Sequence, residues 1–261
     1  MNELEQKHLE KLGFRFTRNG VHSARTIMLN ELELLFAYVE DVEAPKQTYI
    51  DAIVSDNCLG KQSGKTRALT ARHLSELYSL DPNIPVFKLL RFFWNRDLQG
   101  HALLSALCAY ARDPLFRVTV PYILDYTKGV SLKREILEAF LDDKEPGRYS
   151  TASLKSIAQN INSSWTKTGH LTGRNIKVRT EAEPTSANVA YSLILSIILG
   201  NRGLFLFDSE PVKMLDCSPG RSMELAQQAA EKGWLVFKKI GEIVEVQIPD
   251  HFSIPEIGGS Q

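Results

Sequence analysis

The stretch Val-Ala-Tyr-Ser-Leu-Ile-Leu-Ser-Ile-Ile-Leu-Gly, residues 189–200, decides the fold. Apolar side chains recur in it at helical spacing, as at Leu193 and Ile197, and Leu195 extends the apolar surface to the opposite side. A helix that is apolar all round is normally central in a helical protein, and Gly200 is placed to end it. The stretch is far shorter than the roughly 20 apolar residues that cross a bilayer.

Amphipathic stretches continue outward from this centre and predict a mainly helical protein. Apolar residues at helical spacing predict helices over residues 28–39, 48–55, 66–80, 86–94, 103–111, 136–141 and 154–165. We expect Ser23 to cap the first of these and Ser131 to cap the helix over 136–141. A polar, basic loop is expected over residues 166–183, and a core strand or chain crossing over 204–207.

The last part of the chain predicts a helix followed by a hairpin. Ser218 and Pro219 are typical of a cap and a first helical residue, and Gly233 is placed to stop the helix at Lys232. Apolar residues alternate with polar ones over 243–248, which predicts the second of two short strands that turn at residues 240–242. A helix followed at once by a hairpin is typical of a winged helix.

A domain boundary is expected at residues 142–147, which read Asp-Asp-Lys-Glu-Pro-Gly and offer no apolar side chain to bury. The expected fold is therefore mainly α, with two helical subdomains carrying helix-turn-helix-like elements and a small C-terminal β-hairpin. Its expected parts are an N-terminal extension (1–22), a helical domain (23–143), a winged-helix-like domain (148–250) and a tail (251–261).

Composition narrows the class of protein. The 261 residues carry 31 Lys and Arg against 31 Asp and Glu, and 43% are hydrophobic, which is too neutral and too apolar for a disordered chain. The cysteines are three (Cys58, Cys108 and Cys217) and form no Cys-x-x-Cys pair, which indicates a reducing compartment. No secretion signal is recognisable, so we expect a cytoplasmic protein without a membrane partner.

Charge is distributed unevenly in spite of the balance. Cations without any acid fill residues 11–30, 57–75 and 150–180. In the last two blocks, short hydroxyl side chains lie among the cations, and this composition suits phosphate oxygens near helix starts. The candidate DNA-binding residues are Lys61, Ser63, Lys65, Thr66, Arg67, Arg72, Lys167, Arg174, Lys177 and Arg179, with Lys238 and Lys239 on the expected wing.

Catalytic machinery is not evident in the sequence. Residues 60–66, Gly-Lys-Gln-Ser-Gly-Lys-Thr, end as a phosphate-binding loop does, but that loop needs a glycine where Leu59 stands. It must also join a strand to a helix, whereas its surroundings here read as helical. The histidines have no metal-ligand spacing, and each is most simply a surface residue or a satisfied core residue. We therefore expect no catalytic residue, metal or cofactor.

The chain resembles the BrxA family of bacterial BREX phage-defence systems. The resemblance rests on Asn-Cys-Leu-Gly-Lys-Gln-Ser-Gly-Lys-Thr-Arg (57–67), His-Leu-Ser-Glu-Leu-Tyr (73–78), Ala-Tyr-Ala-Arg-Asp-Pro (109–114) and Ser-Ser-Trp-Thr-Lys-Thr-Gly (163–169). It covers roughly residues 25–216. Members are helical, resemble the antitermination factor NusB and bind double-stranded DNA. The first twenty residues and the end after Cys217 are expected to be extensions beyond shorter members.

The resemblance implies a non-enzymatic duplex-binding protein that acts beside a methyltransferase, an ATPase and a phosphatase-like protein. Cationic loops would grip the phosphate backbone with weak sequence specificity, because sequence is read only by side chains that reach base edges. Three alternatives stay open at this stage: a protein–protein adaptor of the defence complex, a nucleotidase that uses the loop at 60–66, and an RNA-binding protein.

Overall fold

The computed structural model describes residues 2–254. The α-helices are α1 (Glu3–Leu12), α2 (Leu29–Tyr38), α3 (Lys46–Val54), α4 (Gly64–Tyr78), α5 (Pro85–Trp94), α6 (His101–Arg112), α7 (Pro114–Arg117), α8 (Val120–Leu124), α9 (Arg134–Lys144), α10 (Thr151–Lys167), α11 (Ser186–Ile198), α12 (Glu210–Lys213) and α13 (Pro219–Glu231). The 3-10 turns are η1 (Val21–Ser23), η2 (Gly203–Leu206) and η3 (Asp250–Phe252), and the strands are β1 (Ser131–Leu132), β2 (Leu171–Thr172), β3 (Lys177–Arg179), β4 (Val236–Ile240) and β5 (Ile243–Gln247). The expectation of a mainly α protein with a small C-terminal hairpin is confirmed.

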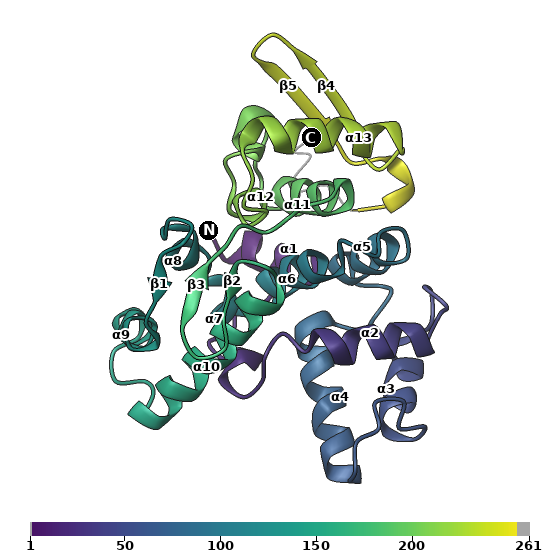
Figure 1. Ribbon diagram of the computed structural model, residues 1–261. Coiled ribbons are helices and arrows are strands. Elements are labelled where there is room, and N and C mark those ends of the chain that lie inside the picture. The colour runs from purple at the N-terminus through teal and green to yellow at the C-terminus, as the bar shows by residue number, and fades with distance from the viewer. Residues whose placement is uncertain (1, 255–261) are drawn as a thin grey trace.

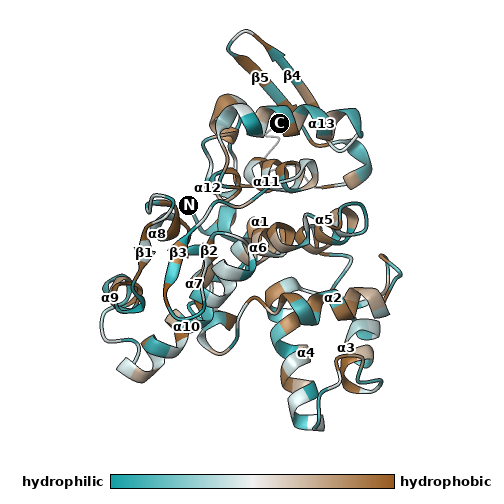
Figure 2. Cartoon of the chain, viewed as in Figure 1, coloured by the Kyte–Doolittle hydropathy of each residue, from teal (hydrophilic) through white to brown (hydrophobic). Residues whose placement is uncertain are grey.

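Helix α11 lies at the centre, as its sequence predicts. Every residue of α11 except Ile197 is buried, and the helix packs against α5, α6, α12 and α13 (Figure 1). Thr185 and Asn188 form a capping box at its start, and Gly200 takes a φ of +93° just after its end. The hydropathy colours of Figure 2 place apolar residues along α11 in the middle of the molecule.

Helices α2, α3 and α4 form one lobe, at the lower right of Figure 1. Leu77 and Tyr78 at the end of α4 are fully buried against the centre, whereas its first residues are exposed. The chain connects α3 to α4 through residues 55–63, which is longer than the turn of about three or four residues in a DNA-binding helix-turn-helix.

The expected cap at Ser23 is wrong. Helix α2 begins only at Leu29, preceded by Met28 in a left-handed conformation, and Ser23 ends η1. The cause is the neighbouring His22, because its buried hydrogen bonds hold this segment in a tight turn and away from α2.

A second lobe contains α7 to α10 and a small antiparallel sheet with strand order β1-β3-β2. Ser131 pairs with Val178 in this sheet and does not cap α9, which corrects the expectation for that serine. The segment 166–183 likewise contains β2 and β3 and is not a loop throughout. Leu171 pairs with Arg179 there, so the hairpin lies directly after α10.

The expected domain boundaries do not separate independent cores. Helices α9 and α10 pack against each other on either side of residues 145–150, and one apolar core runs continuously from Leu9 to Phe252. The described part of the expected N-terminal extension (residues 2–22) packs on this core, where Leu12 and Phe14 are only 2% exposed. The stretch 142–147 comprises the last residues of α9 and the start of the connection to α10, and none of its residues is buried.

At the C-terminal end, Ser218 caps α13 and Pro219 is its first residue, as expected. Strands β4 and β5 pair with Ile240 opposite Ile243. Residues 204–207 form η2 and its end, with Phe205 exposed, and are not a core strand. Of the expected tail, Phe252 is buried and its ring lies 4.8 Å from that of Phe92, while residues 255–261 lie outside the described part of the chain.

Candidate nucleic-acid interface

The start of α4 presents cations and free backbone N–H groups to solvent. Ser63 caps the helix by accepting a hydrogen bond from the N–H of Thr66 at 3.1 Å, and no acid lies in the first turn. The guanidinium of Arg67 folds back over this entrance, with Nη2 3.8 Å from the place that a Cβ on Gly64 would take. Lys65 is exposed and makes no ion pair with any described residue. The arrangement suits a phosphate oxygen.

Two other candidates in this block are already engaged with carboxylates. The Nζ of Lys61 lies 3.1 Å from Glu31, and both side chains are about a quarter exposed. Arg72 is further along α4, where its Nε lies 3.9 Å from Glu76. A cation with a carboxylate beside it is less available to a phosphate, so the site at this end of the lobe reduces to Lys65 and Arg67 with the Ser63 cap.

The string at 60–66 does not have the geometry of a nucleotide-binding loop. Helix α3 precedes it where a buried strand is required, and the sheets among the described residues are antiparallel. Asp208, which the sequence placed at the end of a strand, is exposed and pairs with Lys213 at 2.7 Å. The residues that would hold a nucleotide and its magnesium ion are therefore not arranged for it.

A larger cationic surface runs along α10 and onto the turn between β2 and β3. Helix α10 carries no acid in its entire length, and neither does the hairpin that follows. We call the α10–hairpin surface the set Lys155, Gln159, Lys167, Arg174 and Lys177. The neighbouring acids are neutralised, because Glu181 pairs with Lys128 while Glu135 and Glu138 pair with Arg134.

The turn itself is fixed by glycine. Gly173 has a φ of +89°, and a Cβ there would lie 2.1 Å from the carbonyl oxygen of Ile176, so no other residue fits. The tight turn exposes Arg174, which makes no ion pair with a described residue, and lets the Nζ of Lys177 donate to the carbonyl of Gly173 at 2.6 Å. Burial lowers the pKa of Lys177 below its ordinary value.

Arg179 is not a surface cation, which corrects the prediction that it contacts DNA. It is 4% exposed, and its two terminal nitrogens each lie 2.7 Å from an oxygen of Asp216. Its Nε donates to the carbonyl of Ile123 at 3.0 Å. Arg179 therefore joins the hairpin to α8 and to the chain before α13, and its burial keeps it away from a phosphate at the surface.

The α10–hairpin surface borders a cavity of about 710 Å³. Arg134, Arg174 and Lys177 are its cations, and no acid is among its lining residues. Asn162 also lines it, is 5% exposed, and has an Oδ1 that is buried without a hydrogen-bond partner. The cavity thus combines positive charge with an unpartnered amide.

The hairpin β4–β5 has a balanced charge. Lys238 lies 3.7 Å from Glu245 across the strands, and the Nζ of Lys239 approaches the sulfur of Met223 at 3.5 Å. Helix α13, which would be the recognition helix of a winged helix, pairs its Arg221 with Glu224. This lobe is a weaker candidate for phosphate contacts than α4 or α10.

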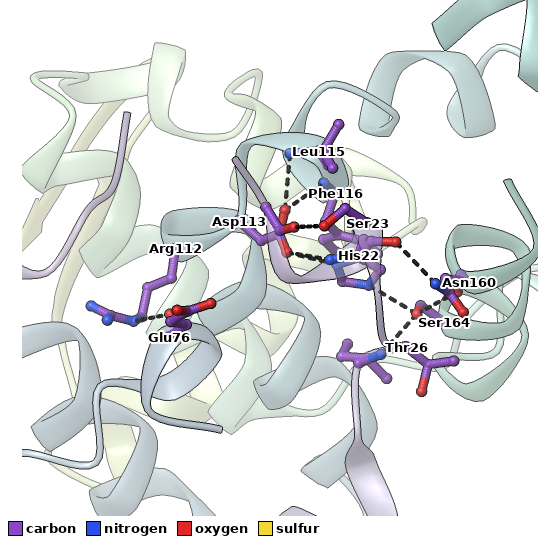
Figure 3. A network of polar contacts seen from close by, with 12 residues as sticks. His22, Ser23, Thr26, Glu76, Arg112, Asp113, Leu115, Phe116, Asn160 and Ser164 are labelled. Carbon is purple, nitrogen blue, oxygen red and sulfur yellow. Dashed lines mark hydrogen bonds and ion pairs between the residues drawn. The ribbon is translucent and has the colours of Figure 1, made fainter. Parts of the chain in front are cut away.

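A Ser–His–Asp constellation that the sequence did not suggest lies in the core (Figure 3). His22 Nδ1 is 2.9 Å from Asp113, and Nε2 is 2.9 Å from the Oγ of Ser164. Ser164 Oγ accepts the N–H of Ile27 and donates its only hydrogen to the carbonyl of Asn160 at 2.8 Å. The hydroxyl is 0% exposed and fully used, so it is a structural clamp and not a nucleophile.

The same network explains the motif at 109–114. Burial acts to raise the pKa of Asp113, but the charge of His22 and hydrogen bonds from its ring and from the N–H groups of His22 and Phe116 outweigh it and lower that pKa. Arg112 donates to the carbonyls of Gly13 and Ser75. Both polar residues of the motif therefore hold the N-terminal segment in place. Of the two roles expected for a histidine, surface residue or satisfied core residue, His22 has the second.

Comparison with known proteins gives no identification: no protein-family model matches the chain, and no curated protein does. Within residues 2–254, no three His, Cys, Asp or Glu side chains gather closely enough to hold a metal ion. No helix there has both the length and the apolar character that a bilayer crossing needs.

Proposed function

We propose that this chain binds double-stranded DNA through its phosphate backbone. The observation that carries the proposal is the α10–hairpin surface, an acid-free helix and turn whose cations lack carboxylate partners among the described residues. Such a surface releases counterions when it meets a polyanion, which gives affinity with little sequence preference.

The start of α4 adds a second contact. Lys65 and Arg67 lie at the outer end of their lobe, and Figure 1 places that end and the β2–β3 turn on the lower side of the molecule, in separate lobes. Two cationic points on one side suit an extended ligand better than a compact one. By its resemblance to the BrxA family, the chain would act in the cytoplasm as a non-enzymatic component of a BREX-type phage-defence system.

A salt titration tests this proposal. Duplex binding is measured by fluorescence anisotropy for the unchanged chain and for the pairs Lys65→Ala with Arg67→Ala and Lys155→Ala with Arg174→Ala. Each lost phosphate contact lowers the slope of log affinity against log salt by about 0.9, so each pair is expected to lower it by about 2.

The matched control removes two cations that are paired on another lobe, Lys213→Ala with Arg221→Ala. It is expected to leave the slope unchanged. Equal slopes for all four proteins would show that neither surface contacts phosphate. Parallel titrations with single-stranded DNA and RNA show which nucleic acid is preferred.

A protein–protein adaptor is the second candidate, because large apolar side chains are exposed in the last lobe. Phe205, Ile240 and Ile243 are each at least 75% exposed, and exposed apolar residues of this kind mark interaction surfaces when they are contiguous. An adaptor would capture its defence partners after nuclease treatment, and Ile240→Ser with Ile243→Ser would abolish that capture while DNA binding persists.

A further inference from the structure

Three properties of the cavity between α10 and the β2–β3 turn favour a ligand-binding site over an ordinary solvated groove. Its volume of about 710 Å³ lies in the range of small-ligand sites. Its lining residues include no acid. Its cations differ in availability, since Arg134 is held by Glu135 and Glu138, whereas Arg174 and Lys177 lack a carboxylate partner among the described residues.

Asn162 is the independent observation that points to a ligand. The residue is 95% buried, and its side-chain amide makes no hydrogen bond to any described residue. An unpartnered buried polar group is destabilising, and proteins rarely keep one without a reason. Its neighbour Thr166 is not the missing partner, because that hydroxyl bonds the backbone carbonyl of Asn162 at 2.7 Å.

An amide at the wall of a cationic cavity has a specific chemical complement. A side-chain amide presents a donor beside an acceptor, which is the pattern that pairs with a nucleobase edge. Arg174 and Lys177 supply the charge for a phosphate, and the lowered pKa of Lys177 reflects a burial penalty that an anion would offset. A nucleotide brings both groups together in one ligand.

We propose that this cavity holds one nucleotide unit, with its phosphate at Arg174 and Lys177 and a polar edge of its base at Asn162. The unit comes either from a free nucleotide or from a strand with one nucleotide displaced from its stack. This site shares Arg174 and Lys177 with the α10–hairpin surface of the proposed function, but it can be tested apart from backbone binding with a ligand that has no duplex.

The test uses the full chain, the four deoxynucleoside monophosphates, inorganic phosphate and a short DNA oligomer in calorimetric titrations. The variant Asn162→Leu removes the amide at nearly constant volume and leaves the cations in place. It is expected to weaken nucleotide binding about tenfold, the effect of one lost hydrogen bond, and to raise the melting temperature because the unpartnered group is gone.

Arg174→Ala is expected to weaken both nucleotide and inorganic phosphate, while Asn162→Leu leaves phosphate unchanged. Arg221→Ala is the charge control on another lobe and is expected to change neither. An effect of Asn162→Leu on monophosphates assigns a free nucleotide as the source, and an effect on the oligomer alone assigns a strand.

The proposal is overturned if Asn162→Leu changes the affinity for none of these ligands, or if it lowers the melting temperature as the loss of a structural hydrogen bond would. Duplex anisotropy that depends on Lys65 and Arg67, found together with no effect of Asn162→Leu on any of these ligands, would sustain the proposed function while removing this site.

Discussion

Replacing Arg179 by methionine separates a structural cation from a DNA-binding one. The guanidinium is 4% exposed, and Asp216, its bidentate partner at 2.7 Å, has a side chain that is 12% exposed. Arg179→Met keeps much of the apolar stem but leaves Asp216 with the N–H of Ala182, at 3.1 Å, as its remaining described partner. The carbonyl of Ile123 also loses the shorter of its two hydrogen bonds and keeps the one from the N–H of Tyr126 at 3.4 Å.

The magnitude follows from this burial. Removing one partner of a buried ion pair costs about 3–5 kcal/mol, because the other charge stays in a poorly solvated place. For a chain of this size, each kcal/mol lowers the melting temperature by about 2–4 °C, so a fall of about 6–20 °C is expected. A loss of about 3–5 kcal/mol is a large share of the roughly 5–15 kcal/mol that stabilises a typical domain.

Urea unfolding at pH 7, followed by circular dichroism, measures the effect, with Arg174→Ala as the matched control. Arg174 is five residues away, exposed and unpaired among the described residues, so its loss is expected to change stability by less than about 0.5 kcal/mol. The double variant Arg179→Met with Asp216→Leu is expected to recover most of the loss, since no uncompensated charge remains. If Arg179→Met unfolded with the same free energy as the unchanged chain, the buried pair would not exist in solution.

The remaining predictions concern other buried groups. Burial lowers the pKa of His170 to about 4. Between about pH 6.5 and 4, this histidine is therefore protonated in the unfolded chain but neutral in the folded chain. As the pH falls through that window, the free energy of unfolding decreases by about 3 kcal/mol. Urea unfolding at pH 7 and 4.5 should show less of this loss in His170→Gln. The pKa of Asp113 is lowered, so the stability that its charge contributes is complete above about pH 4 and is lost in stronger acid. The variant Asp113→Asn should therefore have a lower free energy of unfolding than the unchanged chain at pH 7, and the difference should be smaller near pH 2. Phe252→Ala should cost about 3 kcal/mol in thermal melting, whereas removal of a loose tail residue would cost nothing.

The helices α2–α6, α9–α11 and α13 could be predicted because burial in this fold follows the helical repeat, whereas α1, α7, α8 and α12 were missed. In α11, apolar residues such as Leu193 recur at each helical turn on the sides that pack against other helices. Ser63 and Ser218 cap α4 and α13, where they satisfy backbone N–H groups that any helix start leaves without a partner. Strands β1, β2 and β3 were missed because two or three residues are too short to show an alternation. The Ser131 hydroxyl offered a cap, but strand pairing with Val178 used that residue instead.

For the candidate site, the sequence could predict only which segments are rich in cations and poor in acids, and not which of those cations are exposed and unpaired. The sequence marked Arg174 and Arg179 alike, since both fall within the acid-free block 150–180. In space, Asp216 reaches Arg179 from 37 residues away, and Glu31 reaches Lys61 from 30. The order of charges along a sequence does not show which carboxylates lie beside which cations in the folded chain. The unpartnered Asn162 was equally invisible, because its burial depends on packing between α10 and a hairpin that follows it.

The buried clamp at His22 also sets an order for the making of the protein. Its two side-chain partners lie 91 and 142 residues further along the chain. Domains generally fold from the N-terminus during synthesis, but here the clamp at His22 cannot be completed until Ser164 in α10 has left the ribosome. Contacts that span so much sequence slow folding, since a long loop must close before they form. The clamp at His22 therefore stays incomplete until 142 further residues have been made.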